Sequence, residues 1–328
     1  MLYKFPKNQP FIALLSYDTP EQNIITHPKD AKKFGIEFKL NVKKASPINH
    51  FIKKYPIDFD AYKTSFDKVI NHQKNGDSYL LNLCFSTKIE TNLSLKDIFE
   101  HTKGEAIIYK KDDFVCFTPE PFVAIKDGFI HTFPMKGTIN AALPKAKEML
   151  LNDPKEFSES AMMLDLMRND LGTISTEVKV ESFRYIQKVA QLYQTSSHIS
   201  AKLKKGISFD EIFSSLLPAG SITGTPKQET MRIIKECERE PRGFYTGVFI
   251  YFDGVVCQSF VMIRFVKERS GGLYFFSGGG ITVMSEAKKE YDELIQKVYF
   301  PFLDYKNSKR QCFKFRFSHQ KSSKFSLK

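Results

Sequence analysis

Apolar side chains recur along the chain with two different spacings, and each spacing predicts a different element. Apolar positions three and four residues apart are typical of an amphipathic helix, whereas alternation of apolar and polar residues is typical of a half-buried strand. The helical spacing predicts helices over residues 59–74, 144–152, 156–168, 208–217, 227–238 and 286–299. Ser208 is a typical N-cap for the fourth of these helices, because its hydroxyl can accept a hydrogen bond from a free backbone N–H group.

Strand-like stretches outnumber the helices, and turn residues separate them. Asp127-Gly128 and Asp253-Gly254 each lie between apolar runs, which is a typical hairpin signal. Because hairpins dominate and no regular strand–helix–strand alternation occurs, we predict an α+β fold built on antiparallel sheets. The predicted strands cover residues 79–85, 106–109, 114–118, 122–125, 129–133, 178–186, 189–197, 244–252, 257–267 and 272–277.

Composition excludes several classes of protein. Of the 328 residues, 42% are hydrophobic and 31 are Phe, which is enough apolar material for a large core. No apolar run approaches the ~18 residues needed to cross a bilayer, and the first residues lack a secretory pattern. The five cysteines are scattered without a C-x-x-C pair, so we expect reduced thiols in a cytoplasmic protein.

The net charge of +12 raises the question of nucleic-acid binding. Residues 301–328 contain eight basic residues and one acidic residue, so this tail carries +7 and the rest of the chain +5. We expect the tail to be a poorly ordered extension that catalysis does not need. Contact with RNA or an acidic partner through its basic and aromatic residues is the alternative.

The most informative stretch is PAGSITGTPK at residues 218–227, followed by RGFYTG at residues 242–247. Its glycines let the backbone approach a ligand, its hydroxyl groups can donate hydrogen bonds, and Lys227 and Arg242 supply positive charge. Backbone N–H groups freed in such turns can hold a carboxylate, especially ahead of a helix. A pair of tight turns with exposed basic residues is the alternative interpretation.

Together with five further motifs, these stretches resemble the signature of the chorismate-using enzymes, which include anthranilate, aminodeoxychorismate, isochorismate and salicylate synthases. The motifs occur in the family's order and cover roughly residues 70–300. The five are Thr118-Pro119-Glu120, DLMRNDLG at 165–172, Ile263-Arg264, GGGI at 278–281 and EYDE at 290–293.

The resemblance implies a fold and a division of the chain. The family's fold is two large antiparallel sheets packed as a sandwich, with helices outside and the active site at one end. We expect residues 1–55 to form a shortened N-terminal section packed on the core. Residues 56–300 would form the chorismate-binding catalytic domain, followed by the basic tail at 301–328.

Lys136, in PMKGT, lies beside Gly137 just after an apolar strand, so it is held on a stiff turn. Burial there would disfavour the charged ammonium and leave an amine that can act as a nucleophile. An exposed surface lysine is the alternative. Aminodeoxychorismate synthases have a similar P-I-K-G-T, whereas anthranilate synthases have alanine in place of the lysine. The resemblance implies that Lys136 adds to C2 of chorismate as the 4-hydroxyl group leaves, and that ammonia then attacks C4 and expels the lysine.

The resemblance also implies an acid and a histidine near the leaving hydroxyl group. Hydroxide leaves poorly, so a general acid is needed, and Glu120 of the TPE motif matches the family's candidate. His198, in SSHIS, matches the family's active-site histidine. Without the resemblance, Glu120 would be interpreted as a turn carboxylate and His198 as a core residue of an apolar strand.

Three glutamates match the family's magnesium ligands, namely Glu159, Glu290 and Glu293. Glu290, Glu293 and Lys297 lie on one face of a predicted helix, which by itself is typical of a solvated face. Glu159 lies six residues before Asp165, as the family's metal-binding glutamate does. Carboxylate oxygens suit Mg²⁺, and the ion would bind the C1 carboxylate of chorismate and offset charge repulsion.

Further positions match residues that hold the two carboxylates of chorismate in the family. Arginine suits this role because its planar guanidinium group meets a carboxylate with two hydrogen bonds. Arg168, Asn169 and Asp170 are expected to form a buried polar cluster that supports the site. The matched substrate-binding positions are Thr223, Gly224, Tyr245, Arg264, Gly278, Gly279, Gly280 and Lys297.

Two departures from the family's pattern concern the subtype. Leu80, in GDSYLLNL, stands where glutamine is usual and where isochorismate synthases have a water-activating lysine. Leucine removes any general base from that place, which favours ammonia over water as the nucleophile. An arginine that often follows P-I-K-G-T is missing, since Ile139 and Asn140 come after Thr138.

The sequence therefore predicts the chorismate-aminating subunit of an aminodeoxychorismate synthase, in the p-aminobenzoate branch that leads to folate. Nothing resembles a glutaminase, so ammonia would come from a separate glutamine amidotransferase subunit or from solution. We expect no membrane or nucleic-acid partner. Anthranilate or isochorismate synthase activity on the same substrate is the alternative, and a basic RNA-binding protein is a remote one.

Overall fold

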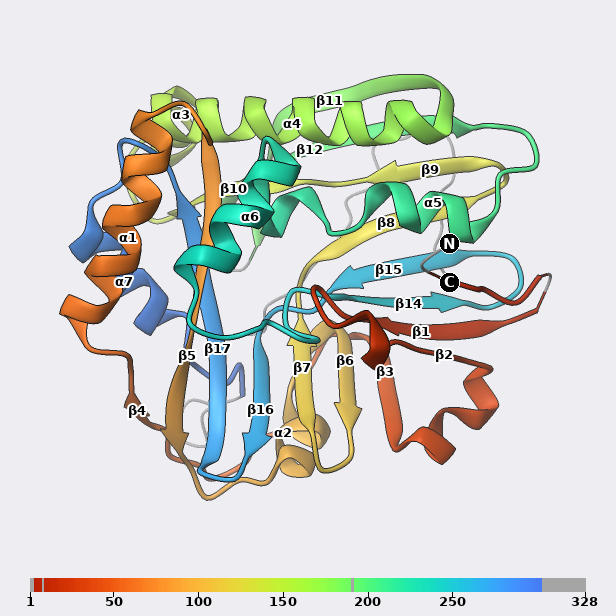
Figure 1. The fold of residues 1–328 in the computed structure, drawn as a ribbon, viewed down its shortest axis with the longest axis horizontal. Coiled ribbons are helices and arrows are strands. Elements are labelled where there is room, and N and C mark those ends of the chain that lie inside the picture. The colour runs from red at the N-terminus through yellow and green to blue at the C-terminus, as the bar shows by residue number, and fades with distance from the viewer. Residues whose placement is uncertain (1–2, 8, 190–191, 303–328) are drawn as a thin grey trace.

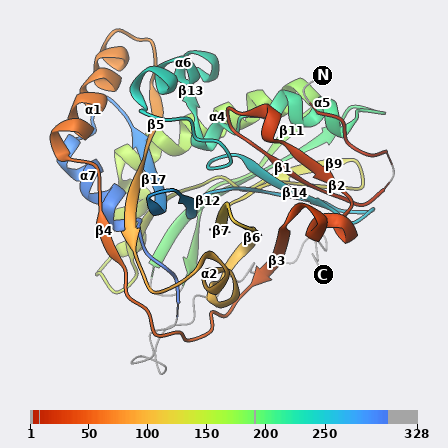
Figure 2. The ribbon, with the colours of Figure 1, turned by 60° about the horizontal axis from the view of Figure 1, so that its bottom comes forward.

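Two antiparallel sheets form the centre of the protein, and helices cover their outer faces (Figures 1 and 2). The computed structural model describes residues 3–7, 9–189 and 192–302. In Figure 1 the strands of one sheet run across the view, and those of the other run up and down it. The predicted α+β class with two large antiparallel sheets is confirmed.

The first sheet has nine strands over the described residues, in the order β10-β12-β9-β8-β15-β14-β1-β2, with β11 paired to β12. Its strands are β1 (Phe11–Leu15), β2 (Ile24–Thr26), β8 (Pro121–Lys126), β9 (Phe129–Thr132), β10 (Met135–Asn140), β11 (Ser175–Val189), β12 (Leu192–Leu203), β14 (Val248–Phe252) and β15 (Cys257–Val261).

The second sheet has the order β13-β5-β17-β16-β7-β6-β3, with β4 paired to β5. Its strands are β3 (Ile36–Val42), β4 (Lys53–Tyr55), β5 (Leu80–Glu90), β6 (Gly104–Lys110), β7 (Phe114–Thr118), β13 (Gly224–Thr225), β16 (Phe265–Arg269) and β17 (Gly272–Ile281).

Helices pack on the outer faces of both sheets, and all six predicted helices form. Helices α4 and α5 cover the first sheet, and α1, α2, α6 and α7 pack against the second. Ser208 caps α5 as predicted, because its hydroxyl accepts a hydrogen bond from the Glu211 N–H group. The α-helices are α1 (Phe59–Lys74), α2 (Leu95–His101), α3 (Ala146–Asn152), α4 (Pro154–Ile174), α5 (Phe209–Leu216), α6 (Lys227–Cys237) and α7 (Ala287–Gln296), with 3-10 turns at Pro20–Gln22, Pro28–Phe34 and Gly220–Ile222.

The first 55 residues supply strands to both sheets. Strand β1 is buried along its whole length and lies between β14 and β2, inside the first sheet. Strand β3 pairs with β6 at the edge of the second sheet. The apolar residues of β1 therefore pack on both sides of the first sheet, one set against α5 and the other against the second sheet.

The single strand predicted over residues 257–267 is wrong, because the chain changes sheet in its middle. Strand β15 ends at Val261 in the first sheet, and β16 begins at Phe265 in the second. Arg264 lies at this crossing with a φ of +55°, in the left-handed region that a regular strand does not use. The predicted substrate-binding Arg264 therefore lies on the segment that joins the two sheets.

Two further predictions from the sequence concern membrane insertion and the cysteines. No helix in the described part of the chain is long and apolar enough to cross a membrane. Cys84, Cys116, Cys237 and Cys257 are free and buried, as expected for reduced thiols. Residues 303–328 of the basic tail, with Cys312, lie outside the described residues.

Candidate active site

Ionic contacts link two helices and a strand that are distant in the sequence. The Lys136 Nζ atom on β10 lies 4.0 Å from Glu159 Oε2 on α4. Lys155 Nζ, one turn before Glu159, lies 3.9 Å from Glu159 Oε1 and 3.6 Å from Glu290 Oε1 on α7. The structure therefore brings together the predicted nucleophile and two of the predicted metal ligands.

The glycine-rich end of β17 lies directly against the acidic face of α7. Lys297 Nζ donates a hydrogen bond to the Gly278 carbonyl at 2.7 Å and pairs with Glu293 Oε1 at 2.7 Å. A Cβ atom at Gly279 would lie 3.5 Å from Glu290 Oε2 and 3.9 Å from Glu293 Oε1. Because these glycines have no side chains, the backbone of this segment is uncovered beside the carboxylates of Glu290 and Glu293.

Glu120 lies between β7 and β8 and faces the same group of charges. Its Oε1 atom accepts a 2.8 Å hydrogen bond from the Ser221 hydroxyl of the signature loop. Burial raises the pKa of the Glu120 carboxyl above its ordinary value, while Ser221, Lys136, Arg264 and Lys297 act in the opposite direction. Glu120 therefore keeps its proton to a higher pH than an exposed glutamate does, as a general acid requires.

The signature loop is fixed by its close approach to β5. Gly224 has a φ of +142°, and an added Cβ atom would lie 1.8 Å from the Leu80 carbonyl oxygen, so only glycine fits. The Thr223 hydroxyl is buried and donates a hydrogen bond to the Ala219 carbonyl at 3.1 Å. Leu80 is buried too, and a Cβ atom at Gly280 would lie 3.1 Å from its Cδ1 atom. An apolar side chain thus stands beside the glycine-rich strand.

The two basic residues of the signature are braces inside the fold, which corrects their interpretation as free positive charges for an anion. Lys227 Nζ donates a hydrogen bond to Asp170 Oδ2 at 2.6 Å. Arg242 is 2% exposed and pairs with Glu238, which is 5% exposed. Its guanidinium also donates to the carbonyls of Ile222 and Asn82, which ties the loop to β5. A buried carboxylate therefore neutralises each charge.

Replacing Arg242 by methionine is expected to destabilise the protein by about 3–5 kcal/mol, because Glu238 would remain buried without its partner. Urea denaturation followed by circular dichroism measures this change. Arg232→Met is the matched control, since Arg232 also pairs with glutamates on α6 but is exposed. Equal losses for the two variants would contradict the bracing role.

The hydrogen-bond partners of Tyr245 and His198 are not residues of the charged group. Tyr245 is buried, and its hydroxyl donates to Cys84 Sγ at 3.7 Å, behind Gly278. Lys136 pairs with Thr195 of β12, so the two share a face of the first sheet, and His198 three residues on points to the other face. There the Nε2 atom of His198 lies 3.1 Å from the Nδ1 atom of His131. Burial lowers the pKa of His198 to about 4. The structure does not bring His198 to the carboxylates, and its catalytic role stays a prediction.

Comparison with known proteins now identifies the family. Residues 15–302 match the sequence pattern of the chorismate binding enzyme family. The chain belongs to this family. An uncharacterized PabA-like protein of Pasteurella multocida is 44% identical over 308 residues, which are 90% of this chain and 95% of that protein. Aminodeoxychorismate synthase component 1 of Bacillus subtilis is 29% identical over 259 residues, 74% of this chain and 55% of that protein. The menaquinone-specific isochorismate synthase MenF of Escherichia coli shares the fold, with a TM-score of 0.70 at 15% identity, over 88% of this chain and 77% of that one.

The predicted magnesium ligands of this chorismate-binding enzyme have the right chemical type for the ion, but their side chains are not gathered around one point. Glu290 and Glu293 lie together beside Gly279, and Lys155 stands between Glu159 and Glu290. Hard carboxylate oxygens are the ligands that Mg²⁺ prefers. Over the described residues, however, no three His, Cys, Asp or Glu side chains form a cluster that could hold a metal ion.

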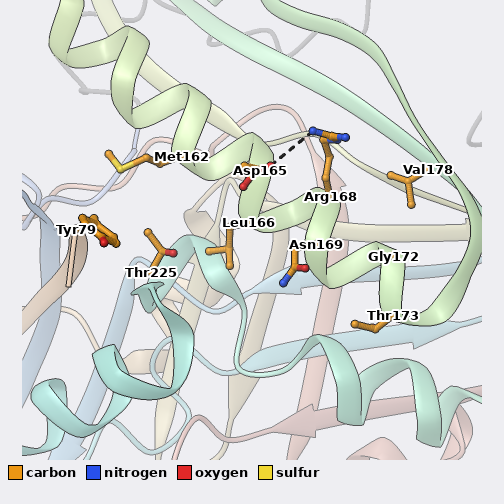
Figure 3. Close-up of a pocket in the computed structure, with 10 residues that line it drawn as sticks. All are labelled: Tyr79, Met162, Asp165, Leu166, Arg168, Asn169, Gly172, Thr173, Val178 and Thr225. Atoms are coloured by element: carbon orange, nitrogen blue, oxygen red, sulfur yellow. Dashed lines mark ion pairs between the residues drawn. The ribbon is translucent and has the colours of Figure 1, made fainter. Parts of the chain in front are cut away.

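A separate cavity of about 930 Å³ lies along α4 of this chorismate-binding enzyme (Figure 3). Its lining includes Arg168 and Asn169 but none of the predicted catalytic, metal or substrate-binding residues. Arg168 and Asn169 are exposed, and Arg168 Nη1 lies 3.6 Å from Asp165 Oδ1. The predicted buried cluster is therefore wrong for Arg168 and Asn169 and right for Asp170 alone, which is buried against Lys227.

Proposed function

We propose that this chorismate-binding enzyme aminates chorismate at C4 to give 4-amino-4-deoxychorismate, the precursor from which a separate lyase forms p-aminobenzoate. The observation that carries the proposal is the position of Lys136, which lies 4.0 Å from Glu159 and within electrostatic reach of Glu120. A primary amine and a protonated carboxyl are the two groups that the reaction requires.

Lys136 is the nucleophile of the first step. Its free amine forms a C–N bond with C2 of chorismate, the ring double bonds shift, and the C4–O bond breaks. Only 20% of its side chain is exposed, which limits competition from water for the amine. In the second step ammonia forms a bond with C4 and the C2–N bond breaks, so Lys136 is released unchanged and the enolpyruvyl ether is kept.

Glu120 is the general acid for the departing 4-hydroxyl group. Its proton leaves with the hydroxyl as water, because hydroxide itself is a poor leaving group. The Ser221 hydroxyl of the signature loop holds the carboxyl in place by a 2.8 Å hydrogen bond. Arg264 and Lys297 are the cations that hold the carboxylates of chorismate in this proposal.

Ammonia, and not water, is the second nucleophile. Leu80 presents an apolar side chain beside Gly280, and it has no atom that could activate water. The ammonia comes from a separate glutamine amidotransferase subunit, as the resemblance to aminodeoxychorismate synthases implies. Mg²⁺ held by Glu159, Glu290 and Glu293 would neutralise a carboxylate of the substrate.

The nucleophile is tested by the rate at which chorismate disappears as the ammonium concentration is varied at alkaline pH. We expect the rate to rise with ammonium up to saturation and to be negligible without it. Rapid consumption without ammonium would mean that water is the nucleophile, and the amination proposal would then be wrong.

A further inference from the structure

Lys155 is a charged residue of the site that the sequence analysis did not single out. The predicted helix began at residue 156, whereas α4 begins at Pro154, so Lys155 lies in its first turn. There it stands four residues before Glu159, a spacing that places both side chains on one face of the helix. The true start of the helix is what makes Lys155 part of the site.

The Lys155 ammonium joins carboxylates from two helices that pack on different sheets. It lies 3.9 Å from Glu159 Oε1 on α4 and 3.6 Å from Glu290 Oε1 on α7. Glu293, the third matched carboxylate, pairs with Lys297 instead, at 2.7 Å. One monovalent cation thus bridges two of the three carboxylates that were matched to magnesium ligands.

The contacts of Lys155 are of a kind that can be released. Both distances exceed those of a charge-assisted hydrogen bond, so the ammonium is held by charge more than by geometry. The Lys155 side chain is 43% exposed, whereas those of Glu159 and Glu290 are 12% and 8% exposed. The lysine can therefore swing into solvent on its flexible stem, while the carboxylates stay where they are.

A divalent cation bound by these carboxylates would lie close to the present position of the ammonium and would be repelled by it. We propose that Lys155 is a resident counter-ion, which holds Glu159 and Glu290 together in the metal-free enzyme and is displaced when Mg²⁺ binds. This inference rests on the metal site of the proposed function. Lys155 then holds α4 and α7 together when no metal is bound, and its positive charge weakens the affinity of the site for Mg²⁺.

The test is Mg²⁺ binding to the purified full chain by isothermal titration calorimetry, without substrate. Lys155→Met removes the charge and keeps most of the stem. We expect it to bind Mg²⁺ about tenfold more tightly than the wild type, since it removes one like charge at close range near the surface. In EDTA its Tm should lie below that of the wild type, and saturating Mg²⁺ should remove the difference.

Two further variants separate the effect of this position from that of net charge. Lys155→Arg keeps the positive charge and should bind Mg²⁺ like the wild type. Lys235→Met removes a charge from an exposed position on α6 and should change neither the affinity nor the Tm in EDTA.

The outcomes distinguish this inference from the metal site itself. If the wild type binds Mg²⁺ and Lys155→Met binds it equally or more weakly, the displacement is wrong and the metal site stands. If neither protein binds Mg²⁺, the metal site of the proposed function is wrong and the inference is overturned with it. If Lys155→Met does not fold, a loss of affinity in Lys155→Arg would overturn the inference by itself.

Discussion

Replacing Lys136 by alanine is expected to lower kcat for chorismate amination by at least about 10³-fold, because an enzyme without its nucleophile keeps only binding and electrostatic contributions. The measurement is the initial rate of chorismate consumption with saturating ammonium. Thermal unfolding is the control for the fold, and we expect Lys136→Ala to unfold near the wild-type temperature, because the ion pair of Lys136 with Glu159 is a loose one, at 4.0 Å.

Lys136→Arg separates the nucleophile from its charge. Arginine keeps a cation beside Glu159, but its guanidinium does not lose a proton and cannot add to C2. We therefore expect Lys136→Arg to be as inactive as Lys136→Ala. Substantial activity in the arginine variant would mean that this position supplies only positive charge, and lysine addition would then be removed from the mechanism.

Replacing Glu120 by glutamine is expected to lower kcat by about 10²–10⁴-fold, which is the usual contribution of a general acid. The pH profile provides a sharper test. Burial raises the pKa of Glu120, so the protonated form that the reaction needs persists to a higher pH than usual and is lost as the pH rises through that pKa. The decline of kcat at alkaline pH should therefore be present in the wild type and absent from Glu120→Gln.

Ser221→Ala is the companion variant for Glu120. The Ser221 hydroxyl favours the ionised carboxyl, so its removal should raise the pKa of Glu120 further and move the alkaline decline to higher pH. A general loss of packing would lower the rate without moving the profile. An unchanged alkaline limb in both Glu120→Gln and Ser221→Ala would contradict the assignment of Glu120.

Local patterns predicted six of the seven α-helices of the described residues, because their signals lie within the elements themselves, but α2 and the strand β10 that carries Lys136 were missed. Helix α1 begins and ends at the predicted residues, and the Ser208 cap forms as its side chain requires. The break at Arg264 was missed, because apolar residues continue on both sides of it. Only the positions of the two sheets force the chain to turn there.

The site was predicted in the same uneven way. Motif resemblance selected Lys136, Glu159, Glu290 and Glu293. Lys136 lies beside Glu159, and Glu290 and Glu293 both lie beside Gly279. The roles of Lys227 and Arg242 could not be predicted, since their partners Asp170 and Glu238 become neighbours only through the tertiary fold. A basic side chain in a glycine-rich loop suggests a ligand, but a buried carboxylate within reach turns it into a structural brace.

The central claim is that the product is 4-amino-4-deoxychorismate, and mass spectrometry of the reaction mixture tests it most directly. The purified chain is incubated with chorismate, Mg²⁺ and an ammonium salt at alkaline pH. We predict a product that carries the added nitrogen, retains the enolpyruvyl group and yields p-aminobenzoate when a lyase is added. Anthranilate or isochorismate as the product would contradict the roles assigned to Lys136 and Leu80.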